Sequence, residues 1–292
     1  MQLGRICWQL KLHAQSCESY LLHDRATEYY ERYLVVGGMP KAVRAYRDTS
    51  SFEAVREVHE GIDITYTADM TDPDNGISAA AAKRIWTSLP KQLLRASTKK
   101  FKYSEVVRGG RRSQLLEPLE WLEAAGIVLK NDLTCDTRAP LAPFNDDEGS
   151  FFKEYICDTG LMFYKFGVEP TLFLDASMRS LLSDDFRGAL AENSVMQALS
   201  AAGLSTYYWM PSEKVGQGEV DFVFQDRAMR VVPVEVKSGR NVKAKSLAKL
   251  IREGRSNRAY LLSENDFSKS PSGVDGCEIR KIPLYSAFCL GA

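Results

Sequence analysis

The chain has 292 residues, of which 45% are apolar and 26% charged, and its 38 basic residues balance its 38 acidic ones. This length suits two or three packed domains of ~100–150 residues each and excludes both a disordered tail and a disulfide-stapled mini-protein. No apolar run approaches the ~18–20 residues that span a bilayer, and the start of the chain lacks the apolar core of a secretory signal. We therefore expect a cytoplasmic protein that does not enter a membrane.

The cysteines and histidines argue against zinc chemistry and against a histidine-based catalytic triad. The six cysteines are scattered without a Cys-x-x-Cys pair, and no histidine follows His59. A cytoplasmic setting predicts reduced thiols. Cys157 stands beside Asp158 with no base to activate it, so it is not expected to act as a nucleophile.

The neutral total hides two strongly basic stretches. The stretch from Lys83 to Arg112 carries a local net charge of +9, and the stretch from Arg227 to Arg258 carries +8. Such segregation can present a basic surface to a polyanion, and solvated helix faces are the alternative interpretation.

The first half of the chain is expected to be mainly helical. Residues 1–75 predict a helical segment interrupted at Gly37-Gly38 and closed by the turn signal TDPDNG. Residues 76–145 predict three helices, over 80–90, 102–110 and 111–126, followed by two short strands at 127–132 and 138–144. Three helices and a hairpin form a winged helix, whose third helix can enter the major groove of duplex DNA.

The remaining residues predict a helical connector over 146–185 and an α/β domain over 186–292. Its helices are expected at 186–203 and 243–254, and its strands at 205–210, 218–224, 229–239, 258–263 and 278–286. The fold class expected for the whole chain is therefore α+β or α/β.

Three charged residues in two of these strands form a pattern that suggests chemistry. Asp221 interrupts an apolar strand, and Glu235 and Lys237 share one face of the next strand because side chains alternate. A two-residue turn at Asp226-Arg227 would join the strands as a hairpin and make Asp221 and Glu235 neighbours. Two opposed carboxylates repel unless a cation binds between them.

Glu192, on the apolar stripe of the helix at 186–203, adds a third carboxylate. Asp221, Glu235 and the main-chain carbonyl of Val236 would suit Mg²⁺, and Lys237 could stabilise the charge that develops when water attacks a phosphodiester. This is the logic of the PD-(D/E)xK nuclease core, with Glu192, Asp221, Glu235 and Lys237 as the candidate catalytic residues. The same residues could also serve metal binding or polar packing without turnover.

Nine segments together resemble one protein family. They are YLVVGGMPKAV (Tyr33–Val43), IWTSLPKQL (Ile85–Leu93), KKFKYSEV (Lys99–Val106), LEWLEAAGIV (Leu119–Val128), FFKEYICDTGLM (Phe151–Met162), RGALAENSV (Arg187–Val195), YYW (Tyr207–Trp209), EVDFV (Glu219–Val223) and VEVKSG (Val234–Gly239). From about Tyr29 onward the chain resembles prokaryotic AAA-type ATP-binding proteins that carry the C-terminal domain of unknown function four-one-four-three. The resemblance implies an ATPase module, then a winged-helix-like segment, then a restriction-endonuclease-like domain.

The chain departs from that family in its ATPase module. No Gly-x-x-x-x-Gly-Lys-[Ser/Thr] phosphate-binding loop occurs, so no ATP is expected on this chain and it is not expected to be an ATPase by itself. We expect it to correspond to the C-terminal part of such a protein, either as a truncated or split gene product or as a chain whose ATPase lies on another polypeptide. The partner expected is that ATPase chain or, in a homo-oligomer, a second copy of this chain.

Two functional hypotheses remain from the sequence. The first is a DNA-binding protein with a nuclease-like domain, which would bind duplex DNA through Lys99, Lys100, Lys102, Arg108, Arg111 and Arg112 and cleave it with Mg²⁺. The second is a non-enzymatic module that docks to or regulates an ATPase partner. A decayed remnant without a role is the third, narrower alternative.

Overall fold

The structure is a computed structural model of the chain, and it describes residues 2–94, 100–144, 151–211, 218–240, 245–254, 256–271 and 276–291. The chain divides into two compact units. The sheet unit comprises Met1–Tyr30, Asn131–Phe151 and Ala198–Ala292, and the helical unit comprises Glu31–Lys130 and Phe152–Gln197. The four consecutive segments expected from the sequence are not tested by this division and stay a prediction.

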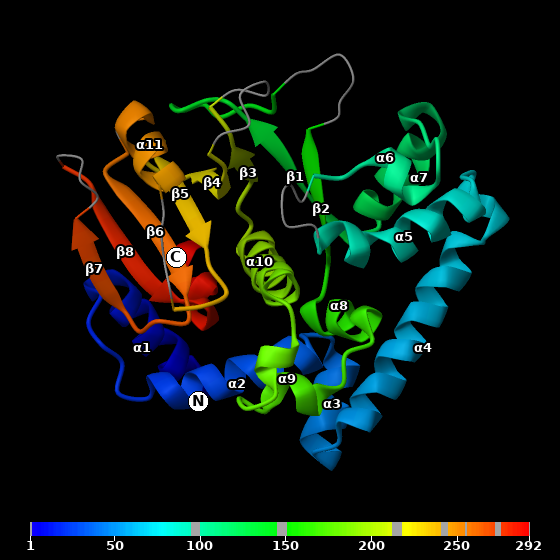
Figure 1. Ribbon diagram of the computed structural model, residues 1–292, viewed down its shortest axis with the longest axis horizontal. Helices are drawn as coiled ribbons and strands as arrows, with labels where there is room; N and C mark the ends of the chain where they lie inside the picture. Colours follow the sequence, from blue (N-terminus) through cyan, green and yellow to red (C-terminus); the bar gives the residue numbers. More distant parts are fainter. Residues whose placement is uncertain are drawn as a thin grey trace. The chain divides into compact units, whose positions relative to one another are not determined.

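The helical unit follows the helix signals of its sequence (Figure 1). Its elements, in chain order, are the end of α2 (His23–Val36), α3 (Pro40–Thr49), α4 (Phe52–Met70), the 3-10 turn η1 (Pro73–Asn75), α5 (Ala79–Leu93), α6 (Tyr103–Val106), α7 (Arg112–Ala124), the start of β1 (Val128–Thr134), β2 (Phe152–Ile156), α8 (Thr159–Phe166), α9 (Pro170–Leu174), the 3-10 turn η2 (Arg179–Leu181) and most of α10 (Asp184–Ala201). Several of the helices begin at side-chain caps, among them α4, α5 and α8. Ser51, Ser78 and Asp158 each accept a hydrogen bond from a main-chain N–H in the first turn of α4, α5 and α8.

The glycine pair of the segment YLVVGGMPKAV has a packing role. The Gly38 N–H donates to Asp158 Oδ2 at 2.7 Å, and the φ of Gly37 is +73°. A Cβ on Gly37 would lie 2.1 Å from Asp158 Oδ1, and one on Gly160 would lie 2.5 Å from the Gly37 nitrogen. Only glycine allows this close approach of the two segments, so the motif has a role in main-chain packing.

The sheet unit is built around a mixed β-sheet (Figure 1). Besides the end of β1, its strands are β3 (Thr206–Trp209), β4 (Val220–Gln225), β5 (Val231–Val236), β6 (Arg258–Ser263), β7 (Ser268–Pro271) and β8 (Glu278–Pro283), and its helices are α1 (Gln2–Ser16), the start of α2, the end of α10, α11 (Lys245–Gly254) and the 3-10 segment η3 (Leu284–Gly291). The strands lie in the order β1-β3-β4-β5-β6-β8-β7. The pairs β3-β4, β4-β5 and β7-β8 are antiparallel, and β1-β3, β5-β6 and β6-β8 are parallel.

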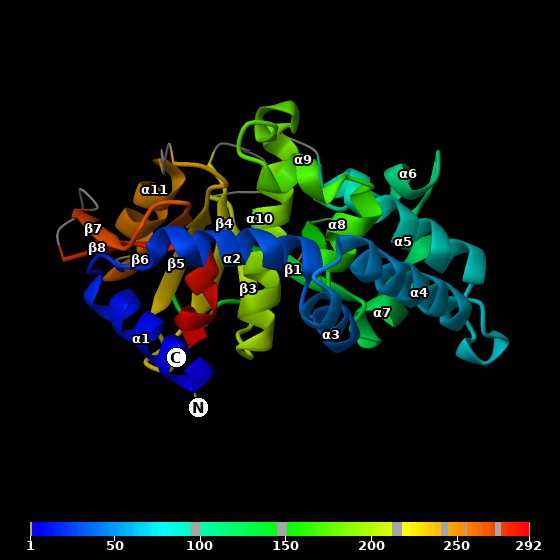
Figure 2. The same cartoon turned by 90° about the horizontal axis from the view of Figure 1, so that it is seen from below.

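Helical segments cover both faces of this sheet. Leu247, Leu250 and Ile251 of α11 pack in one buried cluster with Ala259 and Leu261 of β6. The intervening Tyr260 projects to the opposite face, where it lines a pocket together with Leu290 of η3. Figure 2 shows α11 and η3 on opposite sides of the strands. The central strands β4, β5 and β6 are therefore buried on both sides, as their near-continuous apolar sequences require.

The expected fold class is confirmed, since the chain combines helices with a mixed sheet. The prediction of a second strand in the wing, over residues 138–144, is wrong. Residues 138–144 form no strand, and β1 pairs instead in parallel with β3, with Asp132 opposite Tyr207. Pro140 and Pro143 supply no N–H to a strand ladder, which accounts for the difference. None of the described helices is long and apolar enough to cross a membrane.

Candidate active site

The hairpin of β4 and β5 brings the predicted carboxylates together. Phe222 pairs with Val234 and Val223 with Pro233, and continuing this register places Asp221 opposite Glu235. The predicted neighbourhood of these two acids is therefore confirmed. The connecting loop is longer than the expected two-residue turn. It runs from Asp226 to Arg230, and Asp226 Oδ1 accepts hydrogen bonds from the N–H groups of Ala228 and Arg230.

Asp221 is fixed at the start of β4 by the main chain of the neighbouring strands. Its Oδ2 accepts a hydrogen bond of 2.8 Å from the Val236 N–H. The buried Asn131 side chain donates through Nδ2 to the Asp221 carbonyl at 3.3 Å. Asp221 is partly buried, and the hydrogen bond from Val236 orients its carboxylate.

Glu235 lies deeper, on the face of the sheet that carries α11. It pairs with Leu261 of the cluster under α11, and it is 5% exposed. Its Oε1 accepts a hydrogen bond of 2.6 Å from Lys237 Nζ, whereas no described residue donates to the buried Oε2. Burial raises the pKa of the Glu235 carboxyl to about 8, helped by the charge of Asp221 and opposed by Lys237.

The pair Asp221 and Glu235 fits a divalent cation of the magnesium type. Two carboxylates face each other, and Glu235 Oε2 is buried without a partner among the described residues, so it offers an oxygen for a hard cation. No group of three or more Cys, His, Asp or Glu side chains gathers around a metal position within the part of the chain that the structure describes. Any further ligands would be main-chain carbonyls, water or substrate phosphate.

Glu192 has partners within its own unit. Its Oε1 accepts hydrogen bonds from Lys153 Nζ at 3.1 Å and from the Tyr155 hydroxyl at 2.5 Å, both on β2. Lys153 and Glu192 are almost completely buried, so the ion pair is shielded from water. The expected role of Glu192 beside Asp221 and Glu235 stays a prediction.

The sequence analysis missed Lys153 and Tyr155 as partners of Glu192. A usable signal was present, because Lys153 and Tyr155 are two residues apart on β2 and so project to the same face. A lysine on the same strand face as Tyr155 and fully buried requires a buried acid as its partner.

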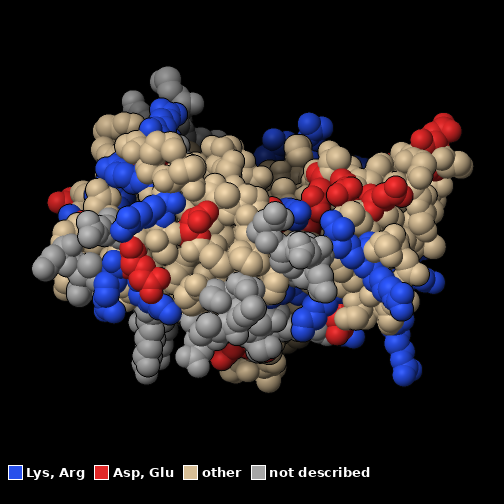
Figure 3. Space-filling view, turned by 90° about the horizontal axis from the view of Figure 1, so that it is seen from above, with Lys and Arg blue, Asp and Glu red and all other residues tan. Residues whose placement is uncertain are grey.

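The residues expected to bind DNA lie mostly on exposed positions. Lys102, Arg108, Arg111 and Arg112 are exposed, Lys100 is half-buried, and Lys99 lies outside the described residues. Arg112 hydrogen-bonds Tyr103, whose pKa burial raises to about 12. Figure 3 shows the Lys and Arg side chains of one face in separate groups with acidic side chains between them.

Models of two known protein families match separate segments of the chain. The family model described as "Domain of unknown function (DUF8612)" matches residues 27–172, which is half of the chain. The chain belongs to this family. A second model, "Domain of unknown function (DUF4143)", matches residues 187–277 and confirms that part of the resemblance seen in the sequence. No curated protein and no solved structure matches the chain.

The site residues described above are divided between the two family matches. Lys153 and Tyr155 lie in the DUF8612 segment, and Asp221, Glu235 and Lys237 lie in the DUF4143 segment. Both descriptions name domains of unknown function, so the chemistry must be argued from the residues.

Proposed function

We propose that this chain is a DNA-binding protein whose C-terminal α/β region cleaves phosphodiesters with the help of Mg²⁺. The observation that carries the proposal is the arrangement on β4 and β5. Asp221 faces Glu235, Lys237 bonds Glu235 Oε1, and the buried Oε2 of Glu235 has no donor among the described residues.

Three residues of the chain would have distinct roles in this reaction. Asp221 and Glu235 would hold the cation, and Asp221 is already oriented by the Val236 N–H. When bound, Mg²⁺ supplies a Lewis acid that activates water and polarises the phosphate. Lys237 would orient Glu235 and place its ammonium group near the negative charge that develops on the phosphate.

Exposed basic residues just before α6 and between α6 and α7 support the DNA-binding part of the proposal. Lys102, Arg108 and Arg111 are exposed and carry no acidic partner that would neutralise them among the described residues. Contacts of such residues to phosphates bring affinity without sequence specificity. Duplex DNA is therefore the proposed substrate.

A plasmid-nicking assay tests the proposal. Supercoiled plasmid is incubated with the chain and Mg²⁺ or Mn²⁺, and the wild type is compared with Asp221→Asn and Lys237→Ala. Glu253→Gln is the matched control, because Glu253 is an exposed acid on α11 and is not among the charged groups that shift the pKa of Glu235. We expect nicking by the wild type and the control and a loss of about 100-fold or more in the two variants. Equal nicking by all four proteins would contradict the proposal.

A second candidate function is a non-enzymatic module that docks to an ATPase on another chain. It is favoured by Glu192, whose carboxylate already has two buried partners and so has a packing role. This function predicts that Asp221→Asn leaves every activity of the complex intact.

A further inference from the structure

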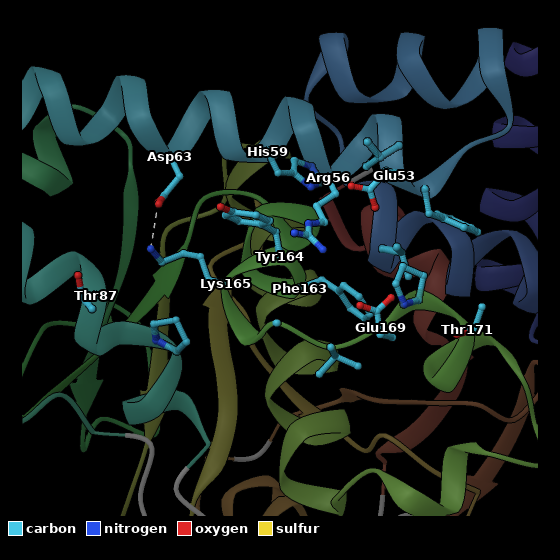
Figure 4. A pocket seen from close by; sticks show the side chains of 17 residues that line it. Glu53, Arg56, His59, Asp63, Thr87, Phe163, Tyr164, Lys165, Glu169 and Thr171 are labelled. Atoms are coloured by element: carbon cyan, nitrogen blue, oxygen red, sulfur yellow. Dashed lines mark hydrogen bonds and ion pairs between the residues drawn. The ribbon is translucent and has the colours of Figure 1, made fainter.

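The helical unit contains a cavity that the proposed function does not use. Its volume is about 530 Å³, within the range of ~300–1,000 Å³ that is usual for small-molecule sites. It lies between α4 on one side and α8 with the following segment to Thr171 on the other (Figure 4). All of its lining residues lie in the helical unit and in the DUF8612 segment.

One face of α4 supplies four polar side chains to the cavity. Glu53, Arg56, His59 and Asp63 follow one another at intervals of three, three and four residues, so they project from the same side of the helix. Figure 4 shows all four on the side of α4 that faces Tyr164.

Asp63 is already engaged by groups of the protein. It accepts hydrogen bonds from Lys165 Nζ at 3.1 Å and from the Trp86 indole N–H at 2.6 Å. Lys165 Nζ also lies 4.1 Å from the centre of the Trp86 ring. These contacts leave His59, Arg56 and Glu53 as the side chains of α4 with capacity for a ligand.

His59 carries a buried polar atom in the wall, Nε2, without a hydrogen-bond partner among the described residues. Its side chain is 1% exposed, and a hydrogen bond joins the ring to the main chain of Val36. Burial also lowers the pKa of His59, which favours the neutral ring. With the neutral ring bonded to the main chain of Val36 through its other nitrogen, Nε2 would be the acceptor and would take an N–H or O–H donor.

The opening of the cavity carries charges of both signs. Arg56, Glu53 and Glu169 are exposed and form no ion pair with a described residue. The wall also contains the aromatic side chains of Phe52, Phe163 and Tyr164. A ligand with one charge would leave the opposite charge of the opening unused, whereas a zwitterion would use both.

We propose that this cavity binds a free aromatic amino acid whose ring carries a hydrogen-bond donor, as in tyrosine or tryptophan. The ring would pack against Phe163 and Tyr164, and its O–H or N–H would donate to His59 Nε2. The carboxylate would pair with Arg56, and the ammonium group with Glu53 or Glu169. The DUF8612 segment would then be a ligand-sensing part of the chain, independent of phosphodiester cleavage.

The test is calorimetric titration of the full chain with matched ligands. L-tyrosine and L-tryptophan are compared with L-phenylalanine, which lacks the ring donor, with tyramine, which lacks the carboxylate, and with 3-(4-hydroxyphenyl)propionate, which lacks the ammonium group. We expect L-tyrosine or L-tryptophan to bind at least about tenfold more tightly than each of these three. No binding of any ligand at millimolar concentration would overturn the proposal, as would equal affinity for L-phenylalanine and L-tyrosine.

Two variants connect the binding to the named side chains. Arg56→Gln changes an exposed residue, so the fold should persist, and it should weaken L-tyrosine while leaving tyramine unchanged. His59→Leu should remove the preference for L-tyrosine over L-phenylalanine. Glu57→Gln, at an exposed position of α4 that does not line the cavity, is the control and should bind like the wild type. Unchanged binding by both Arg56→Gln and His59→Leu would place the ligand elsewhere and overturn the proposal. Plasmid nicking is expected to be the same in all three variants, so failure here is distinguishable from failure of the proposed function.

Discussion

At the scale of single residues, burial decides what each charged group can do. Asp221 and Glu235 face each other, yet only Glu235 is enclosed enough for its pKa to rise to about 8. The sequence predicted the pairing from the alternation of two strands. It could not predict the depth of Glu235, because depth depends on α11 and on the neighbouring β6.

The ionisation of Glu235 should lower stability as the pH rises. Its carboxyl binds a proton more tightly in the folded state, with a pKa of about 8 against an ordinary 4.5, so the cost is absent below pH 4.5 and complete above pH 8. We expect Glu235→Gln to raise the free energy of unfolding at pH 8.5 by on the order of 2 kcal/mol and to change it little at pH 4.5. Urea denaturation at both pH values measures this. A variant that is less stable than the wild type at pH 8.5 would contradict the assignment.

Gly37 is the residue at which any side chain should be costly. A Cβ there would clash with Asp158, in addition to the strain of φ at +73°. We expect Gly37→Ala to lower the free energy of unfolding by ~3 kcal/mol or more. Gly76→Ala is the control, because Gly76 has a φ of +68° but no atom within 4 Å of its Cβ position, and it should cost ~1 kcal/mol. Equal losses in the two variants would show that the contact with Asp158 does not matter.

At the scale of elements, the spacing of apolar residues and the positions of Gly and Pro predicted most helices and strands of the C-terminal part of the chain. The strands expected at 205–210, 218–224, 229–239, 258–263 and 278–286 correspond to β3, β4, β5, β6 and β8, and the two expected helices correspond to α10 and α11. β7 was not expected, because its sequence Ser268–Pro271 is short and polar. Partners distant in sequence were not predictable, and the parallel pairing of β1 with β3 is the clearest example.

The pairing of β2 with α10 through Lys153 and Glu192 gives a test at this scale. Removing either side chain of the ion pair leaves the other charge buried without its partner. Lys153→Met or Glu192→Leu alone should therefore lower the free energy of unfolding by ~3–5 kcal/mol. The double variant should cost less than the sum of the two, with a coupling of at least about 1 kcal/mol. Chemical denaturation of the four proteins measures the coupling. Strict additivity would show that the ion pair does not form.

At the scale of the whole molecule, the neutral total charge conceals segregated basic stretches. Two family matches cover residues 27–172 and 187–277, and the proposed cleavage site and the proposed amino-acid cavity fall in different matches. A partner ATPase or a second copy of the chain stays a prediction from the resemblance.

The basic residues on and before α7 should give DNA binding a strong salt dependence. Each phosphate contact contributes about 0.9 to the slope of log K against log salt concentration, so Arg108→Gln combined with Arg111→Gln should reduce the slope by about 1.8. Fluorescence anisotropy with a labelled duplex at several salt concentrations measures the slope. Arg44→Gln, at an exposed position of α3, is the control and should leave the slope unchanged. A slope that is the same in the double variant and the wild type would exclude these arginines from the DNA-binding surface.

The central claim is that Asp221 and Glu235 together bind a divalent cation. Calorimetric titration of the wild type, Asp221→Asn and Glu253→Gln with Mn²⁺ and then Mg²⁺ tests it most directly. We predict binding of one ion by the wild type and by Glu253→Gln, and a loss of at least about tenfold in affinity in Asp221→Asn, because one of the two facing carboxylates is removed. No binding by the wild type at millimolar concentration, or equal binding by Asp221→Asn, would contradict the account and leave the carboxylate pair with a structural role.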